Sequence, residues 1–261
     1  MKNKIIWITG ASSGIGEALT YRLNELGAKL IISSRNRDKL YEVKGNCRIN
    51  PLDVHVLPLD LENTASLNDA AESALKIFGR IDIMIHSGGV SQRSLAMETD
   101  LNVARKIMDI NFWGTVALTQ AILPDMILKK SGQIVIISSL VGKFGTRYRS
   151  AYAASKHALH GYFDSLRTEI DPEIKISIIC PGFIKTNVTI NALTGDGSKQ
   201  NSMDDAQANG MPADECALQI IKAIKAEKEE VYIGGKEKYA VLLKRYLPGL
   251  FSKIVRNAKV T

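Results

Sequence analysis

Short runs of apolar, mostly β-branched residues alternate with longer amphipathic stretches along the whole chain. The runs predict strands at 4–8, 29–34, 54–59, 81–86, 133–138, 174–180 and 231–233, and the longest amphipathic stretches predict helices over 101–129 and 150–170. Strands that alternate with helices are typical of βαβ units. The pattern therefore predicts an α/β fold with a Rossmann-type, doubly wound parallel sheet of about seven strands in three αβα layers.

The clearest single helix follows the first strand. Ile15, Leu19, Leu23 and Leu26 recur there at helical spacing, so one face of this helix is expected to pack on the sheet. Gly27 is expected to cap its C-terminus, because glycine adopts the left-handed conformation at little cost.

Two segments depart from the alternating pattern. Residues 188–212 are polar, rich in Gly and Asn, and too long for an ordinary connection, which predicts a mobile loop over a substrate site. Residues from about 240 to 261 form a basic amphipathic segment with an apolar stripe at Leu243, Tyr246, Leu247, Leu250, Phe251 and Ile254. Such a stripe is expected to contact the core or another subunit, while a substrate lid and attachment to a membrane surface stay open as alternatives. No linker or internal repeat divides the chain, so a single domain over 1–261 is predicted.

Composition and charge narrow the functional classes. The 261 residues are 45% hydrophobic and 23% charged, the balance of a globular protein with a sizeable core. Five charges of the net +7 lie between residues 244 and 261, where there is no acidic residue; they are Lys244, Arg245, Lys253, Arg256 and Lys259. Basic residues gathered at one end do not form the extended basic groove that nucleic acid requires, so no nucleic-acid partner is expected.

The cysteines and the N-terminus bear on location. Cys47, Cys180 and Cys216 are an odd, widely separated set without a C-x-x-C pair, which predicts neither a disulfide framework nor a metal site. The apolar run at 5–8 is far too short for a signal sequence or a membrane span. We expect a cytoplasmic protein.

A glycine-rich turn, T-G-A-S-S-G-I-G at 9–16, joins the first strand to the first helix. There Gly10 permits a tight turn, Gly14 lets the backbone approach a pyrophosphate, and Gly16 allows close packing of helix and strand. A turn that merely needs glycines is the alternative, but the strand-turn-helix setting favours dinucleotide binding. The expected phosphate-binding residues are Gly10, Ser12, Ser13, Gly14, Ile15 and Gly16.

The end of the second strand indicates which dinucleotide binds. An NAD-binding fold places a carboxylate here to hold the ribose 2′-hydroxyl, but this chain has Ser34 and Arg35. A guanidinium can pair with a 2′-phosphate, so Arg35, assisted by Arg37, favours NADP over NAD. The alternative is a basic turn that only contacts solvent.

Tyr152 and Lys156 are four residues apart in a predicted helix, so their side chains share one face. Ser139 stands at the end of the preceding strand, where ligands bind in sheets of this kind. The same Tyr–Lys spacing recurs at Tyr232 and Lys236, but two glycines interrupt that pair and the run before it reads as an edge strand. We therefore expect Tyr152 to carry chemistry and Tyr232 to carry none.

The glycine turn at 9–16, Asn111, Ser139, Y-A-A-S-K at 152–156, and Cys180-Pro181-Gly182 with Thr186 together resemble the short-chain dehydrogenase/reductase family, in its compact single-domain branch. The resemblance covers essentially the whole chain. It implies that Tyr152 is the general acid/base, that Lys156 holds the nicotinamide ribose, that Ser139 polarises the carbonyl, and that Asn111 anchors a proton-relay water. The cofactor contacts it implies beyond the glycine turn are Ser34, Arg35, Asp60, Leu61, Ser87, Gly88, Gly89, Asn111, Tyr152, Lys156, Pro181, Gly182, Ile184 and Thr186.

The role of Lys156 has a physical rationale. Tyrosine is a poor base at neutral pH because its ordinary pKa is about 10, and a cation within a few ångströms can lower that pKa by roughly 1–3 units. Lys156 is the expected cation.

One departure from the family pattern lies at the end of the fourth strand. Where the family has N-N-A-G, this chain has His86-Ser87-Gly88-Gly89, and we expect His86 to replace a structural hydrogen bond. A lone buried histidine is more often a core residue than a functional group. The segment from Gly88 to Ser94 also resembles the dehydrogenase/reductase member 7 group, some of whose members act on bulky carbonyls.

Two functions remain at this point. The first is an NADP-dependent oxidoreductase that interconverts an alcohol and a ketone or aldehyde, and the second is a cofactor-binding scaffold of the same fold without activity. The intact set of four catalytic residues favours the enzyme, and a Rossmann methyltransferase would not need the Tyr–Lys pair. By the family's habit we expect a homodimer or homotetramer through the helices at 101–129 and 150–170, with burial of Phe112, Trp113, Leu118, Phe163 and Leu166.

Overall fold

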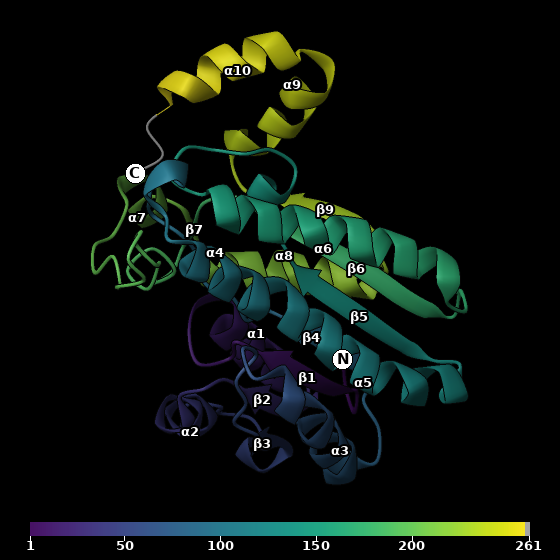
Figure 1. Cartoon of the computed structure of the whole chain (residues 1–261). Helices are drawn as coiled ribbons and strands as arrows, with labels where there is room; N and C mark the ends of the chain where they lie inside the picture. Colours follow the sequence, from purple (N-terminus) through teal and green to yellow (C-terminus); the bar gives the residue numbers. More distant parts are fainter. Residues whose placement is uncertain (259–261) are drawn as a thin grey trace.

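The computed structural model describes residues 1–258, and a seven-stranded parallel sheet lies at its centre (Figure 1). The strand order is β3-β2-β1-β4-β5-β6-β9, so the chain winds outward in both directions from β1. The strands are β1 (Ile5–Thr9), β2 (Lys29–Ser33), β3 (Val54–Val56), β4 (Ile83–His86), β5 (Gly132–Ile137), β6 (Ile174–Pro181) and β9 (Glu230–Ile233). All seven predicted strands are confirmed, and so is the doubly wound α/β fold.

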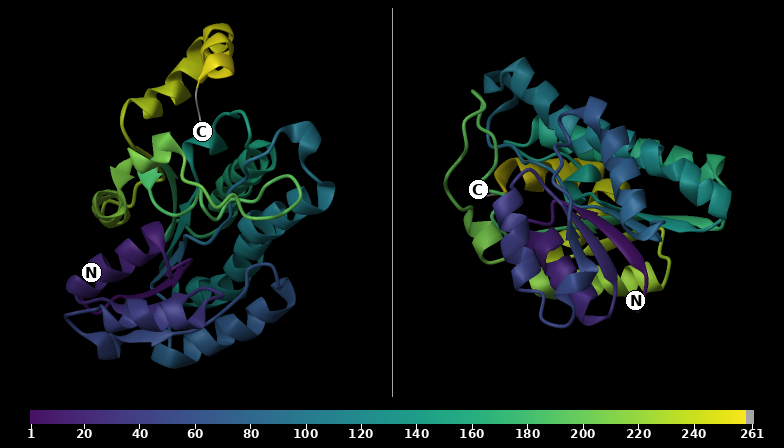
Figure 2. Two further views of the ribbon diagram at one scale, coloured as in Figure 1. Left: turned by 90° about the vertical axis from the view of Figure 1, so that its left-hand side faces the viewer. Right: turned by 90° about the horizontal axis from the view of Figure 1, so that it is seen from below.

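Helices cover both faces of the sheet (Figures 1 and 2). One core contains side chains of α1 (Gly14–Glu25), α2 (Arg37–Gly45) and α8 (Ala213–Lys225). The other contains side chains of α3 (Leu67–Phe78), α5 (Gly114–Lys129) and α6 (Ser150–Glu169). Alternation along β1 serves both cores, because Ile6 and Ile8 enter the first while Trp7 enters the second. A strand covered on both faces has no polar side, which explains the continuous apolar runs.

The long predicted helices form with local differences. Residues 101–129 comprise α4 (Leu101–Met108), one π-helical turn over Asp109–Trp113, and α5. In α1, Leu19 and Leu23 are fully buried as expected, whereas Leu26 is 37% exposed because it lies at the end of the helix. Leu26 is also the C-cap, and Gly27 follows with φ of 73°, so the prediction of Gly27 as the cap was one residue late.

Residues 188–212 are a connection with little regular structure. It follows β7 (Ile184–Lys185), contains α7 (Asp205–Ala208) and ends in β8 (Met211–Pro212), which pairs with β7. Leu193 within it forms bridges to Gln92 and to Lys199. Its mobility stays a prediction.

The C-terminal segment projects from one end of the sheet as two helices, α9 (Ala240–Tyr246) and α10 (Pro248–Asn257), at the top of Figure 1. Phe251 is buried against Phe144, with ring centroids 5.2 Å apart, so this stripe residue packs on the core. Most of the remaining stripe is exposed, namely Tyr246, Leu247, Leu250 and Ile254. Lys259, counted with the basic tail, lies outside the described residues.

Three further observations concern membranes, metals and thiols. None of the helices between residues 1 and 258 combines the length and apolar character needed to cross a membrane. Within the same residues no group of three or more His, Cys, Asp or Glu side chains is placed to hold a metal ion. Cys47, Cys180 and Cys216 are free and buried.

Candidate active site

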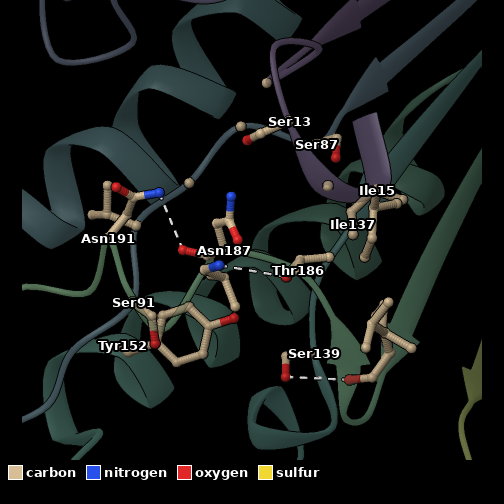
Figure 3. A pocket seen from close by; sticks show the side chains of 18 of the residues that line it. Ser13, Ile15, Ser87, Ser91, Ile137, Ser139, Tyr152, Thr186, Asn187 and Asn191 are labelled. Carbon is tan, nitrogen blue, oxygen red and sulfur yellow. Dashed lines mark hydrogen bonds between the residues drawn. The ribbon is translucent and has the colours of Figure 1, made fainter. Parts of the chain in front are cut away.

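A cavity of about 1090 Å³ opens at the carboxyl ends of the parallel strands, where sheets of this topology bind ligands. Figure 3 shows part of it from close by. Most residues that the sequence singled out line this one cavity: Gly10, Ser12, Ser13, Gly14, Ile15, Ser34, Arg35, Asp60, Leu61, Ser87, Gly88, Gly89, Ser139, Tyr152, Lys156, Pro181, Gly182, Ile184 and Thr186. Gly16 and Asn111 are not among the lining residues.

The glycine turn has the geometry that a phosphate-binding turn needs. Gly10 has φ of 67°, and a Cβ there would lie 2.7 Å from the backbone of Gly88. A Cβ on Gly16 would lie 2.4 Å from the carbonyl oxygen of Gly10, so Gly16 serves close helix–strand packing and faces away from the cavity. Ser13, the N-cap of α1, makes no side-chain cap hydrogen bond in the described structure. The first N–H groups of α1 and the positive end of its dipole suit an anionic pyrophosphate.

The far end of the cavity is polar and has side chains of both charges, because Glu42, which is ion-paired with Lys39, also lines it. Arg35 is exposed on the rim and Ser34 is half-buried beside it. Lys39 also lines this end, a residue that the sequence did not single out. Arg37 does not line the cavity, because its guanidinium lies over the ring of Tyr41, 5.5 Å from the centroid. Of the two candidate arginines, Arg35 lines the cavity and Arg37 does not.

Two side chains of the predicted catalytic set, Ser139 and Tyr152, meet at the other end of the cavity. Ser139 follows β5 and Tyr152 lies in the first turn of α6, and Figure 3 shows both reaching into the same part of the cavity. A side-chain hydrogen bond joins Ser139 and Tyr152. The Ser139 hydroxyl also donates to the Pro181 carbonyl at 3.3 Å, which fixes its direction.

Lys156 lies one helical turn beyond Tyr152 and is 5% exposed. Its ammonium donates to the Ile137 carbonyl at 2.9 Å and lies 5.8 Å from the centroid of the Tyr152 ring. Burial lowers the pKa of Lys156 to about 8, because the charged form loses its hydration. Lys156 therefore gains or loses its proton close to the pH range in which enzymes ordinarily work.

The electrostatics of Tyr152 differ from the expectation. Burial raises its pKa, while the hydrogen bond from Ser139 and the charges of Arg149 and Arg93 lower it. The net direction is thus upward, and the lowering expected from Lys156, whose ammonium lies 5.8 Å from the centroid of the ring, stays a prediction.

Three charged residues near Tyr152 form a buried cluster that the sequence did not reveal. Two hydrogen bonds from Arg93 reach Asp204 Oδ2, at 2.6 and 2.8 Å, and Arg149 reaches the same oxygen at 3.2 Å. The three side chains are 4%, 2% and 6% exposed, in the order Arg93, Asp204, Arg149. Burial, followed by repulsion from Arg93, lowers the pKa of Arg149 to about 10. Both arginines line the cavity.

Asn111 lies behind the cavity wall, in the π-helical turn. Its amide accepts from Val90 N at 2.8 Å and donates to the Val90 carbonyl and the Ser155 hydroxyl. A Cβ on Gly89 would lie 3.0 Å from Asn111 Oδ1, which explains a glycine there. The side chain thus ties the segment after β4 to α6, and contact with a relay water stays a prediction.

His86 is buried at the end of β4 and makes one hydrogen bond, to the Thr119 hydroxyl at 2.9 Å. Within the described chain its other ring nitrogen has no hydrogen-bond partner. Burial lowers the pKa of His86 to about 3, so the ring is neutral. It does not line the cavity, in keeping with a core role.

The second Tyr–Lys pair lies elsewhere. Tyr232 is on β9, which is the edge strand expected, and its hydroxyl donates to Glu230. Neither Tyr232 nor Lys236 lines the cavity. The Tyr152–Lys156 pair thus lines the cavity, whereas the Tyr232–Lys236 pair lies outside it.

The amino-acid sequence is similar to those of known short-chain dehydrogenases. A sequence model described as short chain dehydrogenase matches residues 4–196. The chain is 40% identical over 255 residues to "Dehydrogenase/reductase SDR family member 7" of Homo sapiens, which covers 95% of this chain and 75% of that protein. It is also 40% identical over 265 residues to "Dehydrogenase/reductase SDR family member 7B" of Danio rerio, which covers 98% of this chain and 86% of that one.

Solved structures with lower identity share the fold. A short chain dehydrogenase/reductase from Burkholderia phymatum in complex with NAD has a TM-score of 0.85 at 21% identity, over 100% of this chain and 97% of that one. An alcohol dehydrogenase from Thermococcus sibiricus complexed with 5-hydroxy-NADP has a TM-score of 0.77 at 21% identity, over 90% of this chain and 97% of that one.

Proposed function

Because the chain belongs to the short-chain dehydrogenase/reductase family, we propose that it is an NADP-dependent oxidoreductase that interconverts an alcohol and a ketone or aldehyde. The observation that carries the proposal is one cavity that holds both the glycine turn and the hydrogen-bonded pair of Ser139 and Tyr152. The solved relatives in complex with NAD and with 5-hydroxy-NADP support a nicotinamide cofactor.

Different residues bind the cofactor and transfer the proton. The turn at Gly10 to Gly14 holds the pyrophosphate, and Lys156 holds the nicotinamide ribose. The nicotinamide, when bound, supplies or accepts a hydride. Tyr152 donates a proton to the carbonyl oxygen during reduction and accepts it from the hydroxyl during oxidation, while Ser139 donates a hydrogen bond to the same oxygen.

The function is tested by a screen of aliphatic, aromatic and bulky carbonyls with NADPH and NADH, followed by absorbance of the reduced nicotinamide. Steady oxidation of NADPH that depends on a carbonyl supports the proposal. If cofactor binds but no carbonyl or alcohol is turned over, the inactive scaffold becomes the better description.

The preference for NADP rests on Arg35, whose guanidinium lies on the rim where the 2′-phosphate would bind. NADPH should bind more tightly than NADH by about 1.5–3 kcal/mol, the value of a charge-assisted hydrogen bond. Arg35→Ala should remove most of this difference, measured by fluorescence titration with both cofactors. Arg37→Ala is the matched control, because Arg37 contacts Tyr41 outside the cavity. Equal binding of the two cofactors by wild type would overturn the preference.

A homodimer or homotetramer remains our proposal for assembly, with a corrected interface. Leu118, Phe163 and Leu166 were expected to be buried between subunits, but they are at most 7% exposed in the single chain because they face the sheet. Trp113, in the π-helical turn before α5, is 52% exposed and Leu128 of α5 is 83% exposed, so exposed apolar surface is present along this part of the chain.

Light scattering at micromolar concentration should give a mass of at least twice 28.6 kDa. Trp113→Glu places a charge on the exposed surface just before α5 and should shift the protein toward monomer without loss of folding. A wild-type protein that remains at 28.6 kDa across this concentration range would contradict the proposal.

We propose a cytoplasmic location. The three cysteines are free and buried, and free thiols are typical of the reducing cytosol, whereas secreted proteins usually form disulfides. The exposed apolar and basic residues of α9 and α10 leave contact with a membrane surface open. Ile254 and Val255 also line the cavity, which is an observation in favour of a substrate lid.

A further inference from the structure

The first turn of α6, which carries Tyr152, is capped from a distance. The first N–H groups of a helix have no partner within the helix, and usually the N-cap side chain accepts from them. Here the N-cap is Arg149, which makes no side-chain cap hydrogen bond in the described structure. Instead Gln92 Oε1 accepts from Ala151 N at 2.7 Å and from Tyr152 N at 3.2 Å. A glutamine in the segment after β4 therefore acts as the N-terminal cap of α6.

The orientation of this amide is fixed from its other side. Gln92 is fully buried, and its Nε2 donates to Thr99 Oγ1 at 2.8 Å, Ser94 Oγ at 3.1 Å and Ser150 Oγ at 3.2 Å. If the amide turned over, its NH₂ group would face the two N–H donors of α6. Only one orientation of the amide accepts from the N–H groups of α6 and donates to the three hydroxyls, so the position of Gln92 fixes the position of the first turn of α6.

The same residue also contacts the segment at 188–212. The backbone at Gln92 forms a bridge to Leu193, in which Leu193 N donates to the Ser91 carbonyl at 2.9 Å and Arg93 N donates to the Leu193 carbonyl at 2.8 Å. Leu193 lines the cavity. Gln92 thus links a lining residue of the cavity, Leu193, to the backbone of Tyr152.

We propose that Gln92 is a positioning residue for the reaction proposed above. It holds the backbone of Tyr152 so that the Tyr152 hydroxyl lies at the distance from the substrate oxygen that proton transfer needs. It also couples that distance to the position of residues 188–212. The inference rests on the proposed function. Its physical basis is that displacement of a reacting group by about 1 Å can cost up to about 10²-fold in rate. Gln92 itself need not contact substrate.

The test is Gln92→Met, which keeps the length of the side chain and removes both the acceptor and the donor. With a carbonyl found in the screen, kcat should fall by about tenfold or more, while the dissociation constant for NADPH should stay within about twofold of wild type. Gln92→Glu keeps an acceptor for both N–H groups, and the neighbouring hydroxyls can rotate to donate to it. It should recover most of the lost kcat, and its negative charge should move the basic limb of the alcohol-oxidation profile to higher pH.

Gln133→Met is the matched control. Gln133 is also a buried glutamine, and its Nε2 donates to Ser177 Oγ and the Ile224 carbonyl, away from the cavity. Its substitution should lower stability without changing kcat. Hydrogen exchange of residues 150–154 should become faster in Gln92→Met and remain as in wild type in Gln133→Met.

The outcomes separate the two proposals. If Gln92→Met lowers kcat no more than Gln133→Met does, or if Gln92→Glu recovers nothing, Gln92 is not a positioning residue. If wild type turns over no carbonyl, the proposed function fails, and exchange at 150–154 alone decides the inference. Faster exchange in Gln92→Met would then support it, and unchanged exchange would overturn it.

Discussion

Replacement of Tyr152 by Phe is expected to lower turnover by roughly 10²-fold or more and to leave NADPH binding near wild type. Phe keeps the ring and its packing at the start of α6, and it removes the hydroxyl that shares a hydrogen bond with Ser139. Burial raises the pKa of Tyr152, so at neutral pH the hydroxyl is protonated and ready to donate during carbonyl reduction. Steady-state rates of NADPH oxidation and fluorescence titration of NADPH would measure the two quantities separately.

Tyr232→Phe is the control for this prediction. It removes a hydroxyl that donates to Glu230 on the edge strand, outside the cavity, so both turnover and cofactor binding should remain near wild type. If Tyr152→Phe kept close to full turnover on a substrate of the wild-type enzyme, another group would have to transfer the proton. The assignment of Tyr152 would then be wrong, and the inactive scaffold would gain support.

The sheet could be predicted from the sequence because its physics is local. A parallel strand covered on both faces must be apolar throughout, as Ile6, Trp7 and Ile8 are, and each run of this kind marks one strand. The glycine turn is equally local, since its spacing is read between one strand and the next helix, and a Cβ on Gly16 would lie 2.4 Å from the carbonyl oxygen of Gly10 within the same turn. These features need no knowledge of distant contacts.

The surroundings of Tyr152 could not be predicted in this way. Gln92 and Asp204 reach the start of α6 from segments far away in the sequence, and neither has a periodic signal. Arg149 is near Tyr152 in the sequence, but as the N-cap it lies outside the helix, so helical spacing does not relate the two. The raised pKa of Tyr152 has a similar origin, because it comes from burial, which the sequence does not give.

Three of the residues expected at the subunit interface were misassigned for a related reason. Apolar residues at helical spacing show that a face is buried, but they do not say whether the sheet or another subunit buries it. Leu118, Phe163 and Leu166 face the sheet, whereas Trp113 and Leu128 do not. Exposure in the folded chain separates the two cases.

Replacement of Lys156 by Met is expected to raise the dissociation constant for NADPH by about tenfold or more, because it removes the ammonium proposed to hold the ribose by a charge-assisted hydrogen bond of about 1.5–3 kcal/mol. Met keeps most of the volume of the buried side chain. The Ile137 carbonyl would lose its donor, so some loss of stability is expected as well. Lys143→Met is the control, since Lys143 bonds Glu230 and does not line the cavity.

The pH dependence of NADPH binding distinguishes the charge of Lys156 from its shape. With a pKa of about 8, Lys156 is charged below pH 8 and loses its proton as the pH rises through that value. Wild-type affinity for NADPH should therefore fall between pH 7 and pH 9 and approach that of Lys156→Met, whose affinity should change little over this range. Tyr152, with a raised pKa, and Arg149, with a pKa of about 10, keep their protons there, so neither produces the fall. Parallel pH profiles for wild type and Lys156→Met would mean that the ammonium does not hold the cofactor, even if the substitution weakened binding.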